Sequence, residues 1–291
     1  MNKKPLVSII IVHYKNINIL FECLRSIEKY TSRIDYEVVV VNNAEDPLSI
    51  GDLKIKSLRI VNNYENYGYG KGVNIGFSYS VGRYIFILNP DCILISNVIR
   101  QLLYYLNNDT SIGIVAPMLL NRHRVKYMQI GIKELNPIRS IIVLSFLSKL
   151  VFFRSIVTNY WNTNSEFDTP VSVDLVAGSV FLISRQLFLK LNGFDEKFFL
   201  YFEEVDLCKR VKDLGYEIVI YPKIKIIHIW KATTPKIKKI KTIFENSRRY
   251  YFRKHYGLMN SILVELVLNV SKKIILLILL FSIVLVLILI R

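Results

Sequence analysis

The sequence has few cysteines and none of the common nucleic-acid-binding signatures, and both absences narrow its function. Its three cysteines, Cys23, Cys92 and Cys208, are odd in number, widely spaced and form no C-x-x-C pair. That spacing argues against a disulfide framework or a cysteine-based zinc site and indicates a reducing compartment. Zinc-finger, RRM and basic-zipper patterns are missing, so we expect no nucleic acid as a partner. The N-terminal apolar core spans only Leu6 to Val12 and lacks a small-residue cleavage site, which predicts a strand rather than a signal peptide.

Acidic residues are scarce relative to basic ones. The chain carries 39 Lys and Arg against 23 Asp and Glu, which gives a formal net charge of +16. Eleven of the basic residues lie between Lys223 and Lys254, where Glu245 is the single acid. Such a patch suits the phosphates of an anionic lipid or a diphosphate ligand, although a solvated basic face has the same composition.

One long apolar run stands out, at residues 274–290. It contains one serine and no charge, and it lies between Lys272-Lys273 and Arg291. Its length reaches the lower limit for crossing a bilayer, so we predict a C-terminal transmembrane helix over residues 270–291; a buried core helix is the alternative. Because the lysines precede the run, we expect a single-pass protein of the cell membrane with the preceding part of the chain in the cytoplasm.

Strand and helix patterns alternate in the first half of the chain. Strands are predicted at Leu6–Val12, Glu37–Val41, Ser57–Val61, Tyr84–Leu88 and Ile112–Ala116, with helices at residues 17–27, Val73–Ser80 and Val98–Leu106. Continuous β-branched strands that alternate with helices indicate an α/β fold with a mostly parallel sheet and right-handed crossovers. Such sheets bind their ligands beyond the carboxyl ends of the strands.

The pattern becomes mixed in the second half. A strand at Gly178–Ser184, a helix at Glu203–Leu214 and extended pieces at Glu217–Tyr221 and Lys225–Ile229 are predicted. Before them, Ile141–Phe153 is densely apolar and too short to span a bilayer. A helix in the membrane interface and a buried helix explain this stretch equally well.

Polar side chains follow the ends of the predicted strands. His13-Tyr14 follow the first strand, Asn42 follows the second, and Asn89-Pro90-Asp91 follow the fourth. An isolated Asn-Pro-Asp is also ordinary turn chemistry. The glycine-rich residues 66–76, NYGYGKGVNIG, allow close backbone approach to phosphates or a sugar. Their spacing fits neither the dinucleotide fingerprint nor the P-loop, which disfavours a Rossmann dehydrogenase and a P-loop NTPase.

Seven segments, taken in chain order, resemble the inverting glycosyltransferases of family 2, and most closely the bacterial rhamnosyltransferase-type branch. They are SIIIVHYKN, EVVVVNN, NYGYGKGVNIGF, YIFILNPD, GSVFLISR, GFDEKFFLYFEEVDLCKR and HIW. The resemblance runs from about Val7 to Trp230. It implies a GT-A fold with a Rossmann-like nucleotide-binding half and an acceptor half, a nucleotide-sugar donor and a divalent cation. It also implies inverting transfer of a sugar such as rhamnose to a hydroxyl of a glycan or lipid-linked acceptor in cell-surface polysaccharide synthesis.

The resemblance also suggests a division of the chain. Residues 1–235 would form the GT-A catalytic domain, residues 236–269 a basic, amphipathic membrane-proximal segment, and residues 270–291 the transmembrane helix.

Several residues match the family's donor site. They are His13, Tyr14, Asn42, Asn66, Gly70, Lys71, Asn74, Asn89 and Asp91. Asp91 takes the second position of the family's metal-binding D-x-D, while Asn89 takes the first. One aspartate suffices for Mg²⁺ or Mn²⁺, because diphosphate oxygens and water complete the coordination. His228 occupies a position that adds a metal ligand in some relatives; a structural histidine is the alternative.

Asn42 stands where the family usually has an aspartate that holds the base. An amide both accepts and donates hydrogen bonds, which matches the edge of uracil or thymine. We therefore expect a UDP- or dTDP-sugar as the donor.

Three acids, Glu203, Glu204 and Asp206, match the family's catalytic acidic motif. The register places the general base at Glu204, and an acidic helix start is the alternative role for all three. A sugar nucleotidyltransferase is disfavoured because HYKNIN replaces the glycine- and arginine-bearing loop of that class. A degenerate paralogue that binds nucleotide without turnover stays open, since Asn42, Asn89 and Glu204 each replace a typical aspartate.

Overall fold

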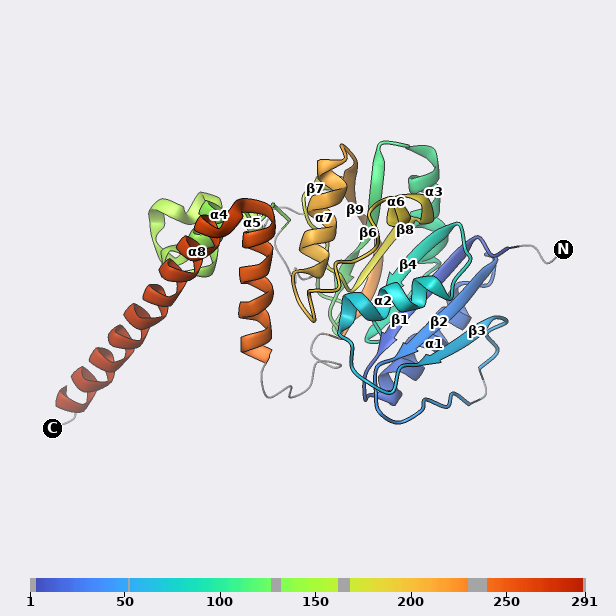
Figure 1. Cartoon of the computed structure of the whole chain (residues 1–291), viewed down its shortest axis with the longest axis horizontal. Coiled ribbons are helices and arrows are strands. Elements are labelled where there is room, and N and C mark those ends of the chain that lie inside the picture. Colours follow the sequence, from blue (N-terminus) through green and yellow to red (C-terminus); the bar gives the residue numbers. More distant parts are fainter. Residues whose placement is uncertain (1–3, 52, 127–131, 162–167, 230–239, 290–291) are drawn as a thin grey trace.

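The computed structural model describes residues 4–51, 53–126, 132–161, 168–229 and 240–289, and it describes side chains as far as residue 274. Within these ranges the chain forms one nine-stranded mixed sheet flanked by helices (Figure 1). The strand order is β3-β2-β1-β4-β8-β6-β9-β5, and β7 pairs with β9.

The first four strands form a parallel half. They are β1 (Val7–His13), β2 (Tyr36–Asn42), β3 (Leu58–Asn62) and β4 (Tyr84–Leu88), connected in part by helices α1 (Ile17–Tyr30) and α2 (Tyr69–Ser78). Every residue of β1 and β4 is buried, as expected for strands covered on both faces. In register, His13 lies beside Asn42 and Asn42 beside Asn62, so the carboxyl ends of the first three strands share one edge.

The other half of the sheet is mixed. It contains β5 (Cys92–Leu94), β6 (Ile112–Leu120), β7 (Val171–Val173), β8 (Val180–Ser184) and β9 (Glu217–His228). Strand β8 runs antiparallel to both β4 and β6, and β5 and β7 run antiparallel to β9. The prediction of a mostly parallel sheet is therefore wrong for this half. Strand periodicity reports which faces are buried, and it carries no information about the direction of the neighbouring strand.

Strand β9 joins the two extended pieces that were predicted separately. Its pairing with β6 jumps from Tyr221 to Lys225 where β6 passes from Pro117 to Met118. This irregularity accommodates Pro222, which has no N–H to donate to a sheet. The strand therefore continues to His228, which lies beside Cys92 at the start of β5.

The remaining regular elements of the described residues are helices. They are α3 (Val98–Asn108), α4 (Pro137–Leu144), α5 (Arg154–Trp161), α6 (Arg185–Lys190), α7 (Glu203–Asp213) and the short 3-10 turns η1 (Phe146–Lys149) and η2 (Val151–Phe153). The apolar stretch 141–153 thus divides: Ile142 and Val143 are buried, whereas Val151 and Phe152 are exposed. The buried-helix alternative holds for α4, and contact of the 3-10 turns with a membrane stays a prediction.

The last helix, α8 (Ile240–Leu289), is bent into two arms at Gly257, whose φ is +84°. Tyr251 and Phe252 on the first arm are fully buried in the larger core cluster together with Phe202. The second arm packs on α4, and Val264 and Leu268 are buried. The first arm, though predicted as a membrane-proximal segment, thus contributes to the core; the domain boundary at 235 stays a prediction.

The predicted transmembrane helix at residues 270–291 falls mostly outside the side chains that the structure describes. Among the described residues, no helix combines the length and the apolar composition needed to cross a bilayer. The structure therefore does not support that part of the predicted fold. Residues 230–239 of the basic segment also lie outside the described ranges.

Candidate active site

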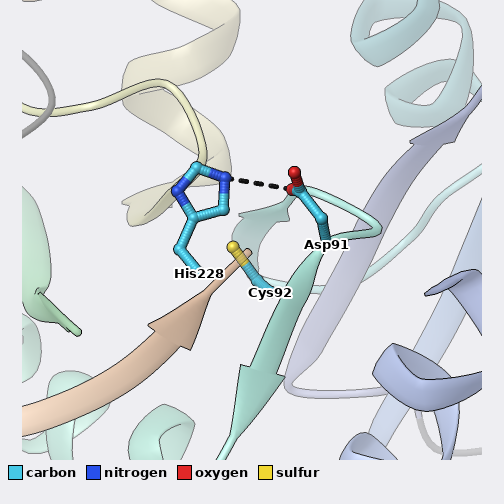
Figure 2. A group of neighbouring side chains, drawn as sticks. All are labelled: Asp91, Cys92 and His228. Carbon is cyan, nitrogen blue, oxygen red and sulfur yellow. Dashed lines mark ion pairs between the residues drawn. The ribbon is translucent and has the colours of Figure 1, made fainter. Parts of the chain in front are cut away.

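The turn after β4 carries Asp91 beneath the end of β9. The backbone of this turn is fixed on both sides: the Asn89 N–H donates to the Ser179 carbonyl at 2.7 Å, and the Ile229 N–H donates to the Asp91 carbonyl at 2.8 Å. The Asp91 Oδ1 lies 3.0 Å from Nε2 of His228, and both side chains are buried (Figure 2). The sheet thus brings together the two residues that the sequence predicted as metal ligands.

Cys92 is the third member of this cluster and was not predicted. Cys92 faces His228 in the β5–β9 register, and the ligand atoms of Asp91, Cys92 and His228 all lie within 4.8 Å of one another (Figure 2). Burial, reinforced by the charge of Asp91, raises the pKa of the Cys92 thiol well above its usual value. The thiol donates to the Ser179 carbonyl at 3.6 Å. Without a bound cation the thiol therefore stays protonated, and thiolates suit softer metals than Mg²⁺.

The remaining donor atoms fit a hard divalent cation. Asp91 offers a carboxylate oxygen and His228 an imidazole nitrogen. The side-chain oxygen of Asn89 is buried and has no hydrogen-bond partner among the described residues. Oxygen and imidazole donors are the ligands that such ions accept, with the rest of the coordination supplied by a diphosphate and water.

Helix α7 begins with the three predicted acids, after two residues in an unusual conformation. Tyr201 and Phe202 have φ of +69° and +68°. Such backbone costs on the order of 1–3 kcal/mol per residue and persists only where packing enforces it. Here Phe202 packs on aromatic rings of α8, including Tyr251. The strained turn sets the direction in which Glu203 and Glu204 leave the backbone.

Within the described part of the chain, Glu203 and Glu204 have no cationic partner. Glu203 is buried and Glu204 is half-buried, and each has one carboxylate oxygen with no hydrogen-bond partner among the described residues. Burial raises the pKa of Glu204 to about 7, opposed by backbone amides at the start of α7. Burial, together with the charge of Glu204, raises the pKa of Glu203 well above its usual value. Glu204 therefore exchanges a proton near neutral pH, while Glu203 keeps its own.

Asp206 has the opposite surroundings. Burial alone would raise its pKa, but a hydrogen bond with His255 and the charges of Arg210 and Lys254 lower it to about 2. The distances to its carboxylate are 2.8 Å from Arg210, 2.5 Å from Lys254 and 2.8 Å from His255. Lys254 also lies 2.8 Å from Asp195. Asp206 is therefore ionised at neutral pH, and its ion pairs hold the first arm of α8 against α7.

Tyr69 connects the metal-type cluster with the acids, and sequence reasoning did not single it out. Its hydroxyl donates to the Gly178 carbonyl at 2.7 Å. Burial raises the pKa of Tyr69 well above its usual value, and the nearby acidic groups add to the effect: Glu203, Cys92, Glu204 and Asp91. The phenol thus lies among both groups and stays protonated. An aromatic residue directly after Gly68 was the signal available in the sequence.

The glycine-rich segment is docked against the loop that precedes α7. Gly68 has φ of +86°, and a Cβ there would lie 2.2 Å from the Phe199 carbonyl oxygen. The Tyr69 N–H donates to that same carbonyl at 2.9 Å. A Cβ added at Gly70 would lie 3.0 Å from the Cβ of Phe194. The glycines therefore allow close approach of protein backbone, in addition to any approach of a ligand.

Three other predicted donor-site residues of this segment have protein partners. Asn66 accepts from the Gly68 N–H at 3.0 Å. Lys71 lies 3.9 Å from Glu196. Asn74 donates to the Phe194 carbonyl and accepts from the Phe194 N–H, both at 2.9 Å. The contacts of Asn74 are those of a structural tether, so its assignment to nucleotide-sugar binding gains no support.

Asn42 is buried at the end of β2 with its amide already in use. Its Nδ2 donates to the Asp46 carbonyl at 2.8 Å and to Asn62 Oδ1 at 3.0 Å, and its Oδ1 accepts from the Ala44 N–H at 3.3 Å. Both N–H donors are occupied, so only the oxygen retains capacity. The predicted donation to a base carbonyl is not supported by this geometry, while acceptance from a base N–H is compatible with it.

His13 and Tyr14 lie at the same edge, at the end of β1. His13 is buried, its Nδ1 has no hydrogen-bond partner among the described residues, and burial lowers its pKa to about 4. Its imidazole is therefore neutral at physiological pH. Tyr14 is half-buried, with the Lys15 ammonium 5.1 Å from the ring centroid.

Comparisons with known proteins agree with this arrangement. Residues 8–189 match the family described as Glycosyl transferase family 2, and residues 159–238 match the one described as the N-terminal domain of galactosyltransferase. The chain belongs to glycosyltransferase family 2. The predicted family and the prediction of an enzyme are confirmed, and the nucleotidyltransferase alternative is set aside.

Relatives of this family 2 glycosyltransferase have glycosyl-transfer names. This chain is 28% identical over 263 residues to the low-salt glycan biosynthesis hexosyltransferase Agl10 of Haloferax volcanii. The match covers 88% of this chain and 76% of the relative. It is 25% identical over 242 residues to the dTDP-rhamnosyl transferase RfbF of Shigella flexneri, over 82% of this chain and 73% of the relative.

Solved structures share the fold of this family 2 glycosyltransferase. GalNAc-T7 with UDP, GalNAc and Mn²⁺ superposes with a TM-score of 0.56 at 15% identity, over 87% of this chain and 51% of the other. The mannosyltransferase PcManGT from Pyrobaculum calidifontis, in complex with GDP-Man and Mn²⁺, gives 0.51 at 14% identity, over 90% of this chain and 74% of the other. These likenesses confirm the predicted GT-A-type α/β fold.

Proposed function

We propose that this family 2 glycosyltransferase transfers a sugar, such as rhamnose, from a UDP- or dTDP-sugar to a hydroxyl of a glycan or lipid-linked acceptor, with inversion at the anomeric carbon. The observation that carries the mechanism is the environment of Glu204. It is the half-buried member of the three acids, it has no cationic partner in the ranges that the structure describes, and its pKa is raised to about 7. A carboxylate with these properties is suited to accept a proton at neutral pH.

The steps follow from the residues that are present. Glu204 takes the proton of the acceptor hydroxyl while that oxygen attacks the anomeric carbon from the face opposite the diphosphate. The bond from the anomeric carbon to the diphosphate oxygen breaks, and the nucleoside diphosphate leaves with the electron pair. Asp91 and His228 would hold a divalent cation, which would supply charge neutralisation for that leaving group. Tyr69 stays protonated and donates to the carbonyl of Gly178, the glycine that packs against Glu204.

The donor is proposed to be a uridine or thymidine diphosphate sugar on two grounds. The Asn42 oxygen retains capacity to accept from a base N–H such as N3–H of uracil or thymine. A relative of this chain, RfbF, is named a dTDP-rhamnosyl transferase. Guanine presents two adjacent donors and would be served better by a carboxylate than by an amide whose own donors are engaged.

A donor panel tests the proposal. Purified enzyme is incubated with UDP-, dTDP- and GDP-sugars, and nucleoside diphosphate release is measured with and without EDTA. We expect release from a UDP- or dTDP-sugar that EDTA abolishes and added Mn²⁺ or Mg²⁺ restores. A GDP-sugar as the best donor would overturn the assignment of the base. Tight donor binding without release in the presence of acceptor extracts would instead identify a binding paralogue.

A further inference from the structure

The second arm of α8 is apolar on the side that faces away from the protein. Val264 and Leu268 pack toward α4 and are buried. The opposite residues, here called the exposed α8 face, are between 48% and 78% exposed: Leu258, Met259, Ile262, Leu263, Leu266 and Val270. Figure 1 shows this arm extending away from the sheet. A helix that is apolar on both sides is covered by something other than water.

A second exposed apolar group lies on the segment that contacts this arm. Val151 and Phe152 are 82% and 94% exposed at the turn η2. The preceding turn η1 is tied to α8, because the Phe146 N–H donates to the Ser271 hydroxyl at 2.8 Å. Two separate parts of the chain therefore present large apolar side chains to solvent near the same helix.

The bend of α8 forms an open groove-like cavity of about 570 Å³ between its two arms. The second arm lines the cavity with Leu258, Ile262 and Leu266, which also belong to the exposed α8 face. The first arm lines it with Arg249 and Arg253. One wall is thus apolar and continuous with the exposed face, and the other carries two guanidinium groups.

The two arginines differ in how far they are neutralised. Arg249 lies 3.3 Å from Glu265, which is also paired with Arg248 at 2.7 Å. Arg253 is exposed and forms no ion pair with any described residue. A guanidinium in this position suits a phosphate oxygen, because it binds such groups with two parallel hydrogen bonds.

We propose that the bend of α8 docks on an anionic phospholipid bilayer, with the exposed α8 face in the acyl layer and Arg253 and Arg249 at the lipid phosphates. Three observations favour a bilayer over a protein partner: the net charge of +16, Lys272 and Lys273 at the end of the face, and the apolar sequence 274–290 that directly continues it. Basic residues at the edge of an apolar helical face bind anionic membrane interfaces. The proposal is independent of turnover and of the donor.

The docking surface is mechanically connected to the catalytic acids. Phe244, on the first arm, packs on Phe202 with ring centroids 5.3 Å apart, and the Ser247 hydroxyl donates to the Leu200 carbonyl at 2.9 Å. The arm that carries the arginines therefore also supports the turn before Glu203. Docking there would hold the acceptor half of the site at the bilayer surface, where lipid-linked acceptors are found.

A fluorophore placed on the face tests the proposal in the full-length chain. All three native cysteines are buried, so an environment-sensitive thiol probe labels an introduced cysteine. Met259→Cys reports the exposed face, and Leu189→Cys, on α6 and 54% exposed, is the matched control. Vesicles of phosphatidylcholine alone and with phosphatidylglycerol are added. We expect a blue shift and a several-fold intensity gain at position 259 with anionic vesicles, and no change at position 189.

Charge substitutions test the cavity separately. Arg253→Gln should raise the lipid concentration at half-maximal signal by about fivefold, the effect of one basic residue at an anionic surface. Arg25→Gln, an exposed arginine on α1, removes the same charge and should leave that concentration nearly unchanged.

Four results would overturn the proposal. They are an unchanged spectrum at position 259 with vesicles, an equal shift at positions 259 and 189, the same half-maximal lipid concentration for neutral and anionic vesicles, or equal effects of Arg253→Gln and Arg25→Gln. A shift at position 259 that depends on protein concentration without lipid would also overturn it and identify a second copy of the chain as the occupant.

Discussion

Asp206 and Glu204 lie two positions apart at the start of one helix, yet the protein gives them opposite acid–base properties. Asp206 is fully buried among Arg210, Lys254 and His255, and its pKa is lowered to about 2. Glu204 is half-buried, has no cationic partner among the residues described, and its pKa is raised to about 7. Burial acts in the same direction on both. The difference therefore comes from the partners: α7 itself supplies Arg210, and α8 supplies Lys254 and His255.

The comparison teaches how one helix turn divides its work. Glu203 and Asp206 are three residues apart, so they share a face and point into the protein, while Glu204 projects about 100° away. The inward Asp206 contacts Lys254 and His255 of α8 and so links the two helices. Glu204 lies over Gly178, where an added Cβ would be 3.0 Å from the Glu204 Cβ. Among the described residues it has no cationic partner, and this leaves it available for proton transfer.

The largest expected effect comes from removing the proton acceptor. Glu204→Gln keeps the size of the side chain but cannot take a proton, so transfer should fall by about 10²–10⁴-fold. Donor affinity should stay within a few-fold of wild type, as measured by calorimetric titration with the nucleotide-sugar. Asp206→Asn should keep most of its turnover in the same assay. A fully active Glu204→Gln alongside an inactive Glu203→Gln or Asp206→Asn would move the base to that neighbour.

The next largest effect on turnover is expected at Asp91, the carboxylate of the predicted metal site. Asp91→Ala should lower metal-dependent turnover by on the order of 10²-fold, because it removes electrostatic stabilisation of the leaving group. Asn89→Asp, the matched control in the same turn, should be tolerated. Turnover with increasing Mn²⁺ measures both variants. Near-normal, EDTA-sensitive activity of Asp91→Ala would place the metal elsewhere.

Replacement of Asp206 should change the free energy of unfolding rather than the rate of transfer. Its folded pKa of about 2 lies below the ordinary 3.8, so its contribution is present above pH 4 and is lost as the pH falls through about 2. The contribution amounts to about 2 kcal/mol. Asp206→Asn should therefore lower the free energy of unfolding at pH 7 and flatten its decline in acid, measured by urea denaturation. Asp213→Asn, an exposed acid of the same helix, is the control.

The pH dependence of turnover should follow Glu204 alone. Its base form is required and its pKa is raised to about 7, so turnover at saturating substrate should rise with pH through that value. Because burial favours the protonated form, the same group should destabilise the fold as the pH rises from 4.5 to 7. An acid limb near pH 4 would show that Glu204 is solvated in the working enzyme.

The smallest effect is expected from crowding the base. Gly178→Ala would place a Cβ 3.0 Å from Glu204 Cβ and 3.4 Å from its Cγ. The side chain must shift by a few tenths of an ångström, and we expect turnover to fall by about tenfold through misalignment. Gly215→Ala provides a glycine control far from the acids, with no neighbouring atom within 4 Å of the added Cβ; its φ of +83° makes it a test of backbone strain alone.

Much of the nucleotide-binding half was predictable from the sequence. Strand β4 matches its prediction at Tyr84–Leu88. Each end of β1, β2 and β3 differs from its prediction by one residue. Continuous β-branched runs identify strands buried on both faces, and helical spacing identifies α1 and α3. The polar residues at the strand ends therefore fall on one edge, as the sheet topology requires.

The mixed half and the contacts of α8 were not predictable in the same way. Strand β8 enters between β4 and β6 in the antiparallel direction, and β9 brings His228 beside Asp91. The cost of closing a loop grows only slowly with its length, so local pattern does not select which distant segment returns as a partner. Asn74 shows the same limit, since its residue type fits a ligand and its neighbours make it a tether.

By itself the sequence determined the α/β class, the parallel strands, the glycosyltransferase family and the positions of the acids, because these depend on local periodicity and on the order of short motifs. The tertiary structure decided which acid is free and which is bound. Lys254 and His255 reach Asp206 from α8, and no cation of the described residues reaches Glu204 in the same way. A carboxylate's pKa depends on its neighbours in space, and chain folding brings those neighbours from distant positions in the sequence.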